Sequence, residues 1–193
     1  MNKDNSSWIT RRKLRDKDNS SWITRRRLPK KVVDIIEEES YKVPWYFFKD
    51  CALPLDIIER DNLDMNPYFS HTLSQGKQQS EHHRFFPLDF VSQIAMKRGT
   101  MIRSHITFHF PKPQKFGQHH NAHIDNDNPH DVVLYYINDA DGDTFFFDEK
   151  RNVIHRETPE RGKMVIFDGS IFHASSPPSK NIRMTLNINY ERT

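Results

Sequence analysis

The second half of the chain alternates apolar and polar residues with a period of two, and this pattern restricts the fold more than any other feature. Five segments after Gly99 have the length and alternation of short β-strands: Met101–Phe110, Asp131–Asn138, Asp143–Asp148, Lys163–Asp168 and Ile182–Tyr190. The DADG sequence at Asp139–Gly142 predicts a hairpin turn. Many short strands without intervening helices are typical of a sandwich, a barrel or a jelly roll.

The last of these segments has the clearest alternation. Its apolar face comprises Ile182, Met184, Leu186, Ile188 and Tyr190. Its polar face comprises Arg183, Thr185, Asn187 and Asn189. Upstream, Pro87–Gly99 has the apolar stripe and the end signals of a helix. A short helix is expected at Pro54–Arg60, and Val32–Glu39 is either a strand or a helical turn.

Charge separates a basic tail from a mildly acidic body. Residues 1–31 contain eleven Lys and Arg against three Asp, a net +8, so the overall charge of +3 leaves −5 for the rest of the 193 residues. An acidic body argues against a nucleic-acid groove within the domain. We therefore expect a tail at residues 1–30 and one folded domain at residues 31–193.

The tail contains a direct repeat. The sequence KDNSSWITRR occurs at Lys3–Arg12 and again at Lys17–Arg26, 14 residues later. Two copies are too few for a solenoid. We expect a disordered segment whose deletion leaves the fold intact. A recent duplication of a basic, polar segment explains the repeat, and the alternative is an arm that contacts an acidic partner or nucleic acid through its basic residues and tryptophans.

The cellular setting follows from what the sequence contains. The single cysteine, Cys51, excludes an internal disulfide framework and indicates a reducing compartment. No apolar run approaches the length of a membrane span. The expectation is a cytoplasmic protein without a membrane partner.

An HxD pair is the first candidate for chemistry. His123 and Asp125 lie two residues apart, so on a strand both side chains point to the same face. One imidazole and one carboxylate make two-thirds of a 2-His-1-carboxylate site, which leaves three coordination positions of Fe(II) open for oxygen chemistry. With eleven histidines in the chain, such a pair by itself is weak evidence.

The third ligand is expected downstream. His173 lies 48 residues after Asp125, enough for several strands, and it follows a predicted strand and turn. His155 and Glu157 form a rival HxE pair, but little chain separates them from the only later histidine, His173. The predicted metal ligands are therefore His123, Asp125 and His173.

Arg183 is the candidate anchor for an anionic ligand. It lies ten residues after His173 on the polar face of the last strand. A guanidinium in a pocket poor in water holds a carboxylate through two hydrogen bonds.

These residues carry a resemblance to a family. HID at 123–125, YYIN at 135–138, GDT at 142–144, FDGSIFH at 167–173 and RMTLN at 183–187 occur in this order. Over residues 100–190 the chain resembles the Fe(II)/2-oxoglutarate-dependent oxygenases, in particular the prolyl-4-hydroxylase-like branch and its small phage and marine-microbial members. It departs from the family at Phe110, where a tyrosine is common, and at Asp143, which replaces the second glycine of a GG pair.

The resemblance implies a mainly β fold, a double-stranded β-helix of the jelly-roll or cupin type, with a few flanking N-terminal helices. It implies Fe(II) held by the three predicted ligands, with O2 as oxidant and 2-oxoglutarate as cosubstrate. Arg183 would bind the distal carboxylate of 2-oxoglutarate with the hydroxyl of Tyr136, and Thr185 and Asn187 are further candidates for that pocket.

The implied activity is a dioxygenase that hydroxylates an unactivated C–H bond, on a prolyl or other amino-acid side chain of a peptide, protein or small molecule, and releases succinate and CO2. Two alternatives stay open. A non-catalytic cupin-like metal-binding module would lack an anchor such as Arg183. A nucleic-acid demethylase would use the basic tail for affinity, but the body offers no evident platform for stacking bases.

Overall fold

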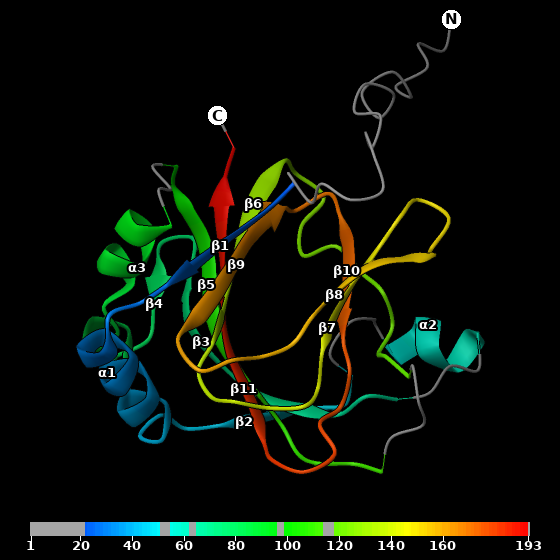
Figure 1. Ribbon diagram of the computed structural model, residues 1–193, viewed down its shortest axis with the longest axis horizontal. Coiled ribbons are helices and arrows are strands. Elements are labelled where there is room, and N and C mark those ends of the chain that lie inside the picture. Colours follow the sequence, from blue (N-terminus) through cyan, green and yellow to red (C-terminus); the bar gives the residue numbers. More distant parts are fainter. Residues whose placement is uncertain (1–21, 51–54, 62–64, 96–98, 114–117, 193) are drawn as a thin grey trace, which may run out of the picture.

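Two antiparallel sheets face each other in the computed structural model, which describes residues 22–50, 55–61, 65–95, 99–113 and 118–192 (Figure 1). Within these residues the larger sheet has the strand order β1-β9-β6-β11-β5-β3-β2, with β4 beside β3, and the smaller sheet has the order β10-β7-β8. The strands are β1 (Ile23–Arg27), β2 (Tyr46–Phe48), β3 (Tyr68–Gln75), β4 (Gln78–Gln79), β5 (Met101–His109), β6 (His130–Tyr136), β7 (Thr144–Phe147), β8 (Val153–Glu157), β9 (Lys163–Asp168), β10 (Phe172–Ser175) and β11 (Arg183–Glu191).

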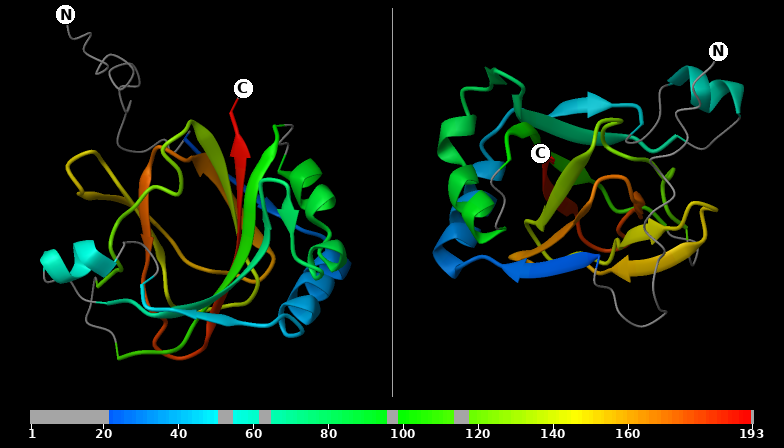
Figure 2. Two further views of the ribbon diagram at one scale, coloured as in Figure 1. Left: turned by 180° about the vertical axis from the view of Figure 1, so that it is seen from behind. Right: turned by 90° about the horizontal axis from the view of Figure 1, so that it is seen from above.

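The described part of the chain contains three α-helices, two of which cover one face of the larger sheet. They are α1 (Lys30–Ser40), α2 (Leu55–Arg60) and α3 (Leu88–Ile94), with a 3-10 turn at His83–Phe85. Figure 2 shows α1 and α3 together on the outer side of this sheet, with α2 apart from them. The predicted helices at residues 54–60 and 87–99 are confirmed in shortened form, and residues 32–39 are helical. No helix in the described part of the chain is long and apolar enough to cross a membrane.

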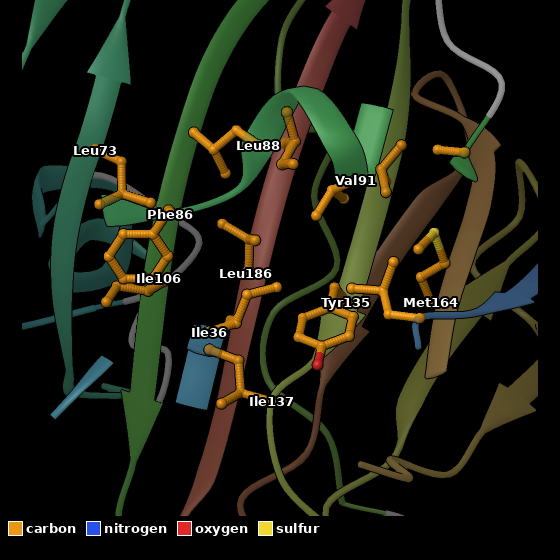
Figure 3. Packing of buried hydrophobic residues seen from close by; sticks show 14 of the residues in the cluster. Ile36, Leu73, Phe86, Leu88, Val91, Ile106, Tyr135, Ile137, Met164 and Leu186 are labelled. Carbon is orange, nitrogen blue, oxygen red and sulfur yellow. The ribbon is translucent and has the colours of Figure 1, made fainter. Parts of the chain in front are cut away.

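The main hydrophobic core lies between α1, α3 and the larger sheet (Figure 3). Ile36 of α1 and Val91 of α3 are fully buried against the sheet. Leu186 of β11 and Ile106 of β5, which are paired in register, supply the facing surface. The apolar half of the alternation on β11 therefore faces the helices.

The polar half of β11 faces the interior between the two sheets. Four polar side chains on this face are at most 8% exposed: Arg183, Thr185, Asn187 and Asn189. Buried polar groups are costly unless they are hydrogen-bonded, so this row must have partners inside the fold. A second apolar cluster, which includes Val132, Tyr136 and Phe146, fills the neighbouring part of the interior.

Two expectations need correction. The DADG segment is not a hairpin turn, because β6 pairs with β9 and β11 whereas β7 pairs with β8 and β10, so the chain crosses between sheets there. Part of the predicted tail belongs to the domain, because residues 23–27 form β1 and pair with β9. The earlier residues 1–21 lie outside the described part of the chain.

Candidate metal centre

Backbone pairing brings His123 next to His173. The amide of each residue donates a hydrogen bond to the carbonyl of the other, with both N···O distances at 3.0 Å, and the two residues form an isolated antiparallel bridge. Residues exchanging both hydrogen bonds lie directly opposite each other with their side chains on one face. The two imidazole centroids are accordingly 4.8 Å apart. The HxD motif itself lies in an irregular segment, because only His123 takes part in strand pairing.

The carboxylate of Asp125 completes the cluster. Its Oδ1 lies 3.6 Å from Nε2 of His123 and 3.8 Å from Nε2 of His173. One ligand atom from each of the three residues lies within 4.8 Å of the others, and no other such group of His, Cys, Asp or Glu occurs among the described residues. Bonds of about 2.1 Å place neighbouring ligands about 3 Å apart, so this cluster needs only a small contraction around an ion. The structure brings together the three residues predicted from the sequence.

Hydrogen bonds orient both imidazoles for metal binding. Nδ1 of His123 lies 3.2 Å from the carbonyl of Asn121, and Nδ1 of His173 lies 3.1 Å from the carbonyl of Ile171. A carbonyl only accepts, so each Nδ1 carries a proton, and each Nε2 is the ring nitrogen that faces the centre. Burial lowers the pKa of His173 to about 4, which keeps this ligand neutral at physiological pH.

Asp125 stays ionised for a different reason. Burial by itself would raise its pKa, but a hydrogen bond with His123 and electrostatic interactions with His173 and Arg103 hold the pKa well below its ordinary value. The side chain is only 5% exposed. The candidate donor set is thus two imidazoles and one carboxylate, the set that suits Fe(II) in oxygenases.

Three side chains from two strands of the larger sheet fix the carboxylate. Its Oδ2 accepts hydrogen bonds from Nδ2 of Asn187 at 2.8 Å and from Nδ2 of Asn189 at 2.9 Å. Nη2 of Arg103 lies 3.4 Å from Oδ1, and Nε of Arg103 donates to Oδ1 of Asn189 at 3.1 Å. With both amides on Oδ2, the other oxygen is presented to the two imidazoles.

Arg183 lies farther along the same interior face, four residues or roughly 13 Å of strand from Asn187. Its side chain is buried, Nε donates to the carbonyl of Gly142 at 2.9 Å, and Nη2 donates to Oγ1 of Thr144 at 2.9 Å. The hydroxyl of Tyr136 lies 2.9 Å from the same Thr144 oxygen. Burial raises the pKa of Tyr136, so its hydroxyl remains protonated.

Two histidines stand beside this arginine. His109 is directly opposite Arg183 in the pairing of β5 with β11, and the ring of His120 lies 5.2 Å from that of His109. Burial and the charge of Arg183 lower the pKa of His120 to about 3. Both effects also hold the pKa of His109 well below its ordinary range. Arg183 is therefore charged at neutral pH, whereas both of these imidazoles are neutral.

The other two candidate residues, Thr185 and Asn187, lie in different places: one near Arg183 and one at the metal centre. Thr185 bonds to Thr107 across β5 and β11, with 2.6 Å between the hydroxyl oxygens, and remains near Arg183. Asn187 lies at the metal centre through its bond to Asp125. The rival pair belongs to neither place, because Glu157 is held by Arg25 and Lys163, and His155 lies 3.0 Å from Glu157.

Sequence reasoning missed Arg103, Asn189 and Thr144 as members of the site. Asn189 could have been found, because the alternation on the last strand places it on the same face as Arg183. Arg103 gave no local signal, since its role depends on pairing β5 with β11.

Comparisons with known proteins agree with this architecture. No family model and no curated protein matches the chain by sequence. An oxidoreductase of the 2OG-Fe(II) oxygenase family from Burkholderia pseudomallei superposes with a TM-score of 0.65 at 14% identity, covering 90% of this chain and 87% of that one. A Trichoplax adhaerens prolyl hydroxylase, solved with a peptide of hypoxia inducible factor, gives 0.61 at 14% identity, covering 89% and 84%.

A viral collagen prolyl hydroxylase from Paramecium Bursaria Chlorella virus-1 gives a TM-score of 0.53 at 12% identity, covering 87% of this chain and 94% of that one. These likenesses confirm the predicted fold: the chain has the mainly β, double-stranded β-helix fold of the 2OG-Fe(II) oxygenases. They extend over nearly the whole chain, and the metal cluster lies within this fold.

Proposed function

We propose that the protein is an Fe(II)- and 2-oxoglutarate-dependent dioxygenase that hydroxylates an unactivated C–H bond and releases succinate and CO2. The observation that carries this proposal is the cluster of His123, Asp125 and His173 inside an oxygenase fold, with ligand atoms within 4.8 Å of one another. Iron with 2-oxoglutarate and O2 would supply the oxidising chemistry. The protein would hold the ligands, orient the cosubstrate and exclude water.

Arg183 is the proposed anchor of the distal carboxylate of 2-oxoglutarate. Its guanidinium has two hydrogen bonds to Gly142 and Thr144, which set its orientation. A buried cation on the same interior face as the metal ligands matches a ligand that is anionic at both ends. Tyr136 supports the same region through Thr144, and Thr185 lies next to Arg183 on that face.

We propose an amino-acid side chain, and among these a prolyl residue, as the site of hydroxylation. The likeness to two prolyl hydroxylases supports this class, while the identity of the substrate depends on loops that vary within one fold. A non-catalytic metal-binding module is the alternative, and the buried Arg183 beside the predicted cosubstrate space speaks against it.

The experiment begins with Fe(II) and 2-oxoglutarate added under nitrogen, where a metal-to-ligand charge-transfer band reports the ternary complex. Oxygen is then admitted, and succinate is measured over a panel of prolyl peptides and free amino acids. We expect one Fe(II) per chain and loss of both signals in Asp125→Ala. Metal binding without the band would favour the non-catalytic module. Turnover that survives His173→Ala but not His155→Ala would assign the ligand to the rival pair.

A further inference from the structure

The edge of β9 holds a strand whose sequence occurs twice in the chain. β1 pairs with β9 over five register positions, from Ile23 opposite Phe167 to Arg27 opposite Lys163. Figure 1 shows β1 alongside β9 at the end of the larger sheet. Most of β1 belongs to the second copy of the repeated segment, which sequence reasoning had assigned to a dispensable tail. The first copy, at residues 3–12, lies outside the described part of the chain.

Apolar side chains from both ends of this segment are anchored in the fold. Ile23 is 6% exposed and belongs to the interior cluster that includes Phe167. Trp22 packs edge-on against Phe146, with 5.3 Å between ring centroids. Leu28 is 7% exposed and lies in the main core. The side chains of Trp22, Ile23 and Leu28 are thus each bound at a separate place in the fold.

A charged position is recognised as well. Nε of Arg25 donates to Oε2 of Glu157 at 3.0 Å, and Nη2 donates to the same oxygen at 2.8 Å. Glu157 is 5% exposed and also receives Nζ of Lys163 at 2.9 Å from Oε1. Removing either cation would leave this buried carboxylate less well compensated, which is costly. The edge of β9 with the adjoining β8 therefore selects a strand with Trp, Ile, Arg and Leu at fixed spacings.

The first copy of the repeat carries the same four residues at the same spacings. They are Trp8, Ile9, Arg11 and Leu14, each 14 residues before its counterpart, with Thr and Arg also repeated at positions 10 and 12. The segments differ only at Lys13, which corresponds to Arg27. The Arg27 side chain is 59% exposed, so lysine fits that position.

We propose that the edge of β9 is a strand-binding site with two ligands in one chain, and that residues 8–14 occupy it when residues 22–28 cannot. Occupation by the first copy would place Leu14 where Leu28 lies, and residues 15–28 would form a loop of 14 residues. Closing such a loop disfavours that arrangement by roughly fiftyfold, because the cost grows as the three-halves power of loop length. The second copy therefore occupies the site in the intact protein.

Occupancy of this site matters for the metal centre. A row of ring contacts leads inward from the strand: Trp22 to Phe146 at 5.3 Å, Phe146 to Phe167 at 5.0 Å, and Phe167 to His173 at 5.0 Å. An empty edge would remove the outer end of this row and uncover β9. A second strand ligand preserves the support of His173, whatever reaction the centre catalyses.

The test compares three full-length variants by urea unfolding. Trp8→Ala with Ile9→Asp damages the first copy and should leave the folding equilibrium unchanged. Trp22→Ala with Ile23→Asp damages the second copy and should lower the equilibrium constant by roughly fiftyfold, the loop factor. All four substitutions together should lower it on the order of a thousandfold or more, since a buried charge and a large cavity then have no replacement.

A second measurement tests whether Arg11 replaces Arg25 in the ion pair with Glu157. Arg11→Glu should have no effect in the intact protein but should destabilise the variant with the damaged second copy, where residue 11 faces Glu157. Equal losses in the two-substitution and four-substitution variants would overturn the proposal. Stability of the second-copy variant that rises with protein concentration would also overturn it, because the replacement strand would then come from another chain.

Discussion

The carboxylate of Asp125 has its two oxygens in different environments, and this difference decides how the residue can bind a metal. Oδ2 accepts two amide hydrogen bonds, from Asn187 and Asn189, whereas Oδ1 is the oxygen nearest both imidazoles. An oxygen that already accepts two hydrogen bonds is a poorer metal ligand. Asp125 is therefore set up to bind through one oxygen, and Asn187 acts on the metal ligand more directly than on a cosubstrate.

Asn187→Ala and Asn189→Ala should each weaken Fe(II) affinity by roughly ten- to a hundredfold, the usual effect of losing a partner of a metal ligand. The affinity of the iron-loaded protein for 2-oxoglutarate should hardly change. Metal titration under nitrogen measures both. Asn152→Ala is the matched control, because the amide of Asn152 also donates to an aspartate, Asp148 at 2.9 Å, but on an exposed loop. A selective loss of 2-oxoglutarate affinity would return Asn187 to the cosubstrate pocket.

Arg183 is the proposed anchor of the cosubstrate, so its substitution tests the proposal that 2-oxoglutarate binds here. Arg183→Lys keeps the charge but lacks the planar fork, so 2-oxoglutarate should bind roughly ten- to a hundredfold more weakly, as expected for about 1.5–3 kcal/mol lost from a charge-assisted contact. Fe(II) affinity should be unchanged, and Tyr136→Phe should act in the same direction more mildly. Titration of the charge-transfer band measures the effect. Arg161→Lys, at an ion pair with Asp34 and Glu37, is the control. Unchanged affinity in Arg183→Lys would place the anchor elsewhere.

At the scale of elements, β8 and β9 are joined to β1 by one buried carboxylate. Burial would raise the pKa of Glu157, but hydrogen bonds from Arg25, His155 and Lys163 lower it from 4.5 to about 2. A carboxyl whose pKa is depressed in the folded state stabilises the protein above its unfolded pKa, and the contribution is lost as the pH falls through the folded value. The window of loss therefore runs from about pH 4.5 down to about pH 2.

Glu157→Gln should lower the free energy of unfolding at pH 7 by about 3 kcal/mol, because Arg25 and Lys163 lose their shared buried partner. The difference from the unsubstituted protein should shrink steadily below pH 4.5, because the carboxylate is then progressively protonated. Urea unfolding at stepped pH values from 7 to 3 measures this convergence. Glu160→Gln is the control, since Glu160 also contacts Lys163 but its side chain is 49% exposed. Parallel curves would show that Glu157 does not titrate in this window.

Elements with a strong local pattern could be predicted from the sequence, and those defined by distant partners could not. The alternation on β11 predicted its apolar and its polar face, whereas the expectation of a pocket around Arg183 came with the family resemblance. β1 was missed because a segment as basic as ITRRR resembles a solvated tail. Its pairing depends on Glu157, far along the chain, which forms an ion pair with Arg25. The DADG segment has the chemistry of a turn, but turn chemistry does not decide which sheet the next strand joins.

The same distinction holds within the site. The two histidines and Asp125 could be predicted because a metal demands specific residue types, and the chain offers few arrangements of them. Arg103 and Thr144 could not be predicted, because their roles arise from cross-strand neighbours that the local sequence does not specify. Asn187 was assigned to the correct face, but its hydrogen bond to Asp125 could not be predicted, since alternation gives the face and not the neighbour.

At the scale of the whole molecule, the repeat supplies two nearly identical copies of the N-terminal strand. We expect the fold to need one copy, so that either copy can be deleted while the other remains. Removing residues 1–14 leaves the second copy in place. Removing residues 15–28 joins Leu14 to Pro29 and leaves an almost identical strand, with lysine in place of Arg27. Both deletions should retain the melting temperature and the Fe(II) affinity of the full chain.

Removing residues 1–28 should instead abolish the cooperative melt or lower it sharply. The loss of Ile23 and Leu28 alone removes about 3–6 kcal/mol of burial, against a total stability of about 5–15 kcal/mol for a typical domain. Glu157 also loses Arg25, and the apolar β9 becomes an exposed edge prone to pairing with other chains. Thermal denaturation, light scattering and Fe(II) titration of the three deletions measure these effects. A soluble, cooperatively folded protein without residues 1–28 would show that β1 is dispensable, and that the domain begins near residue 30.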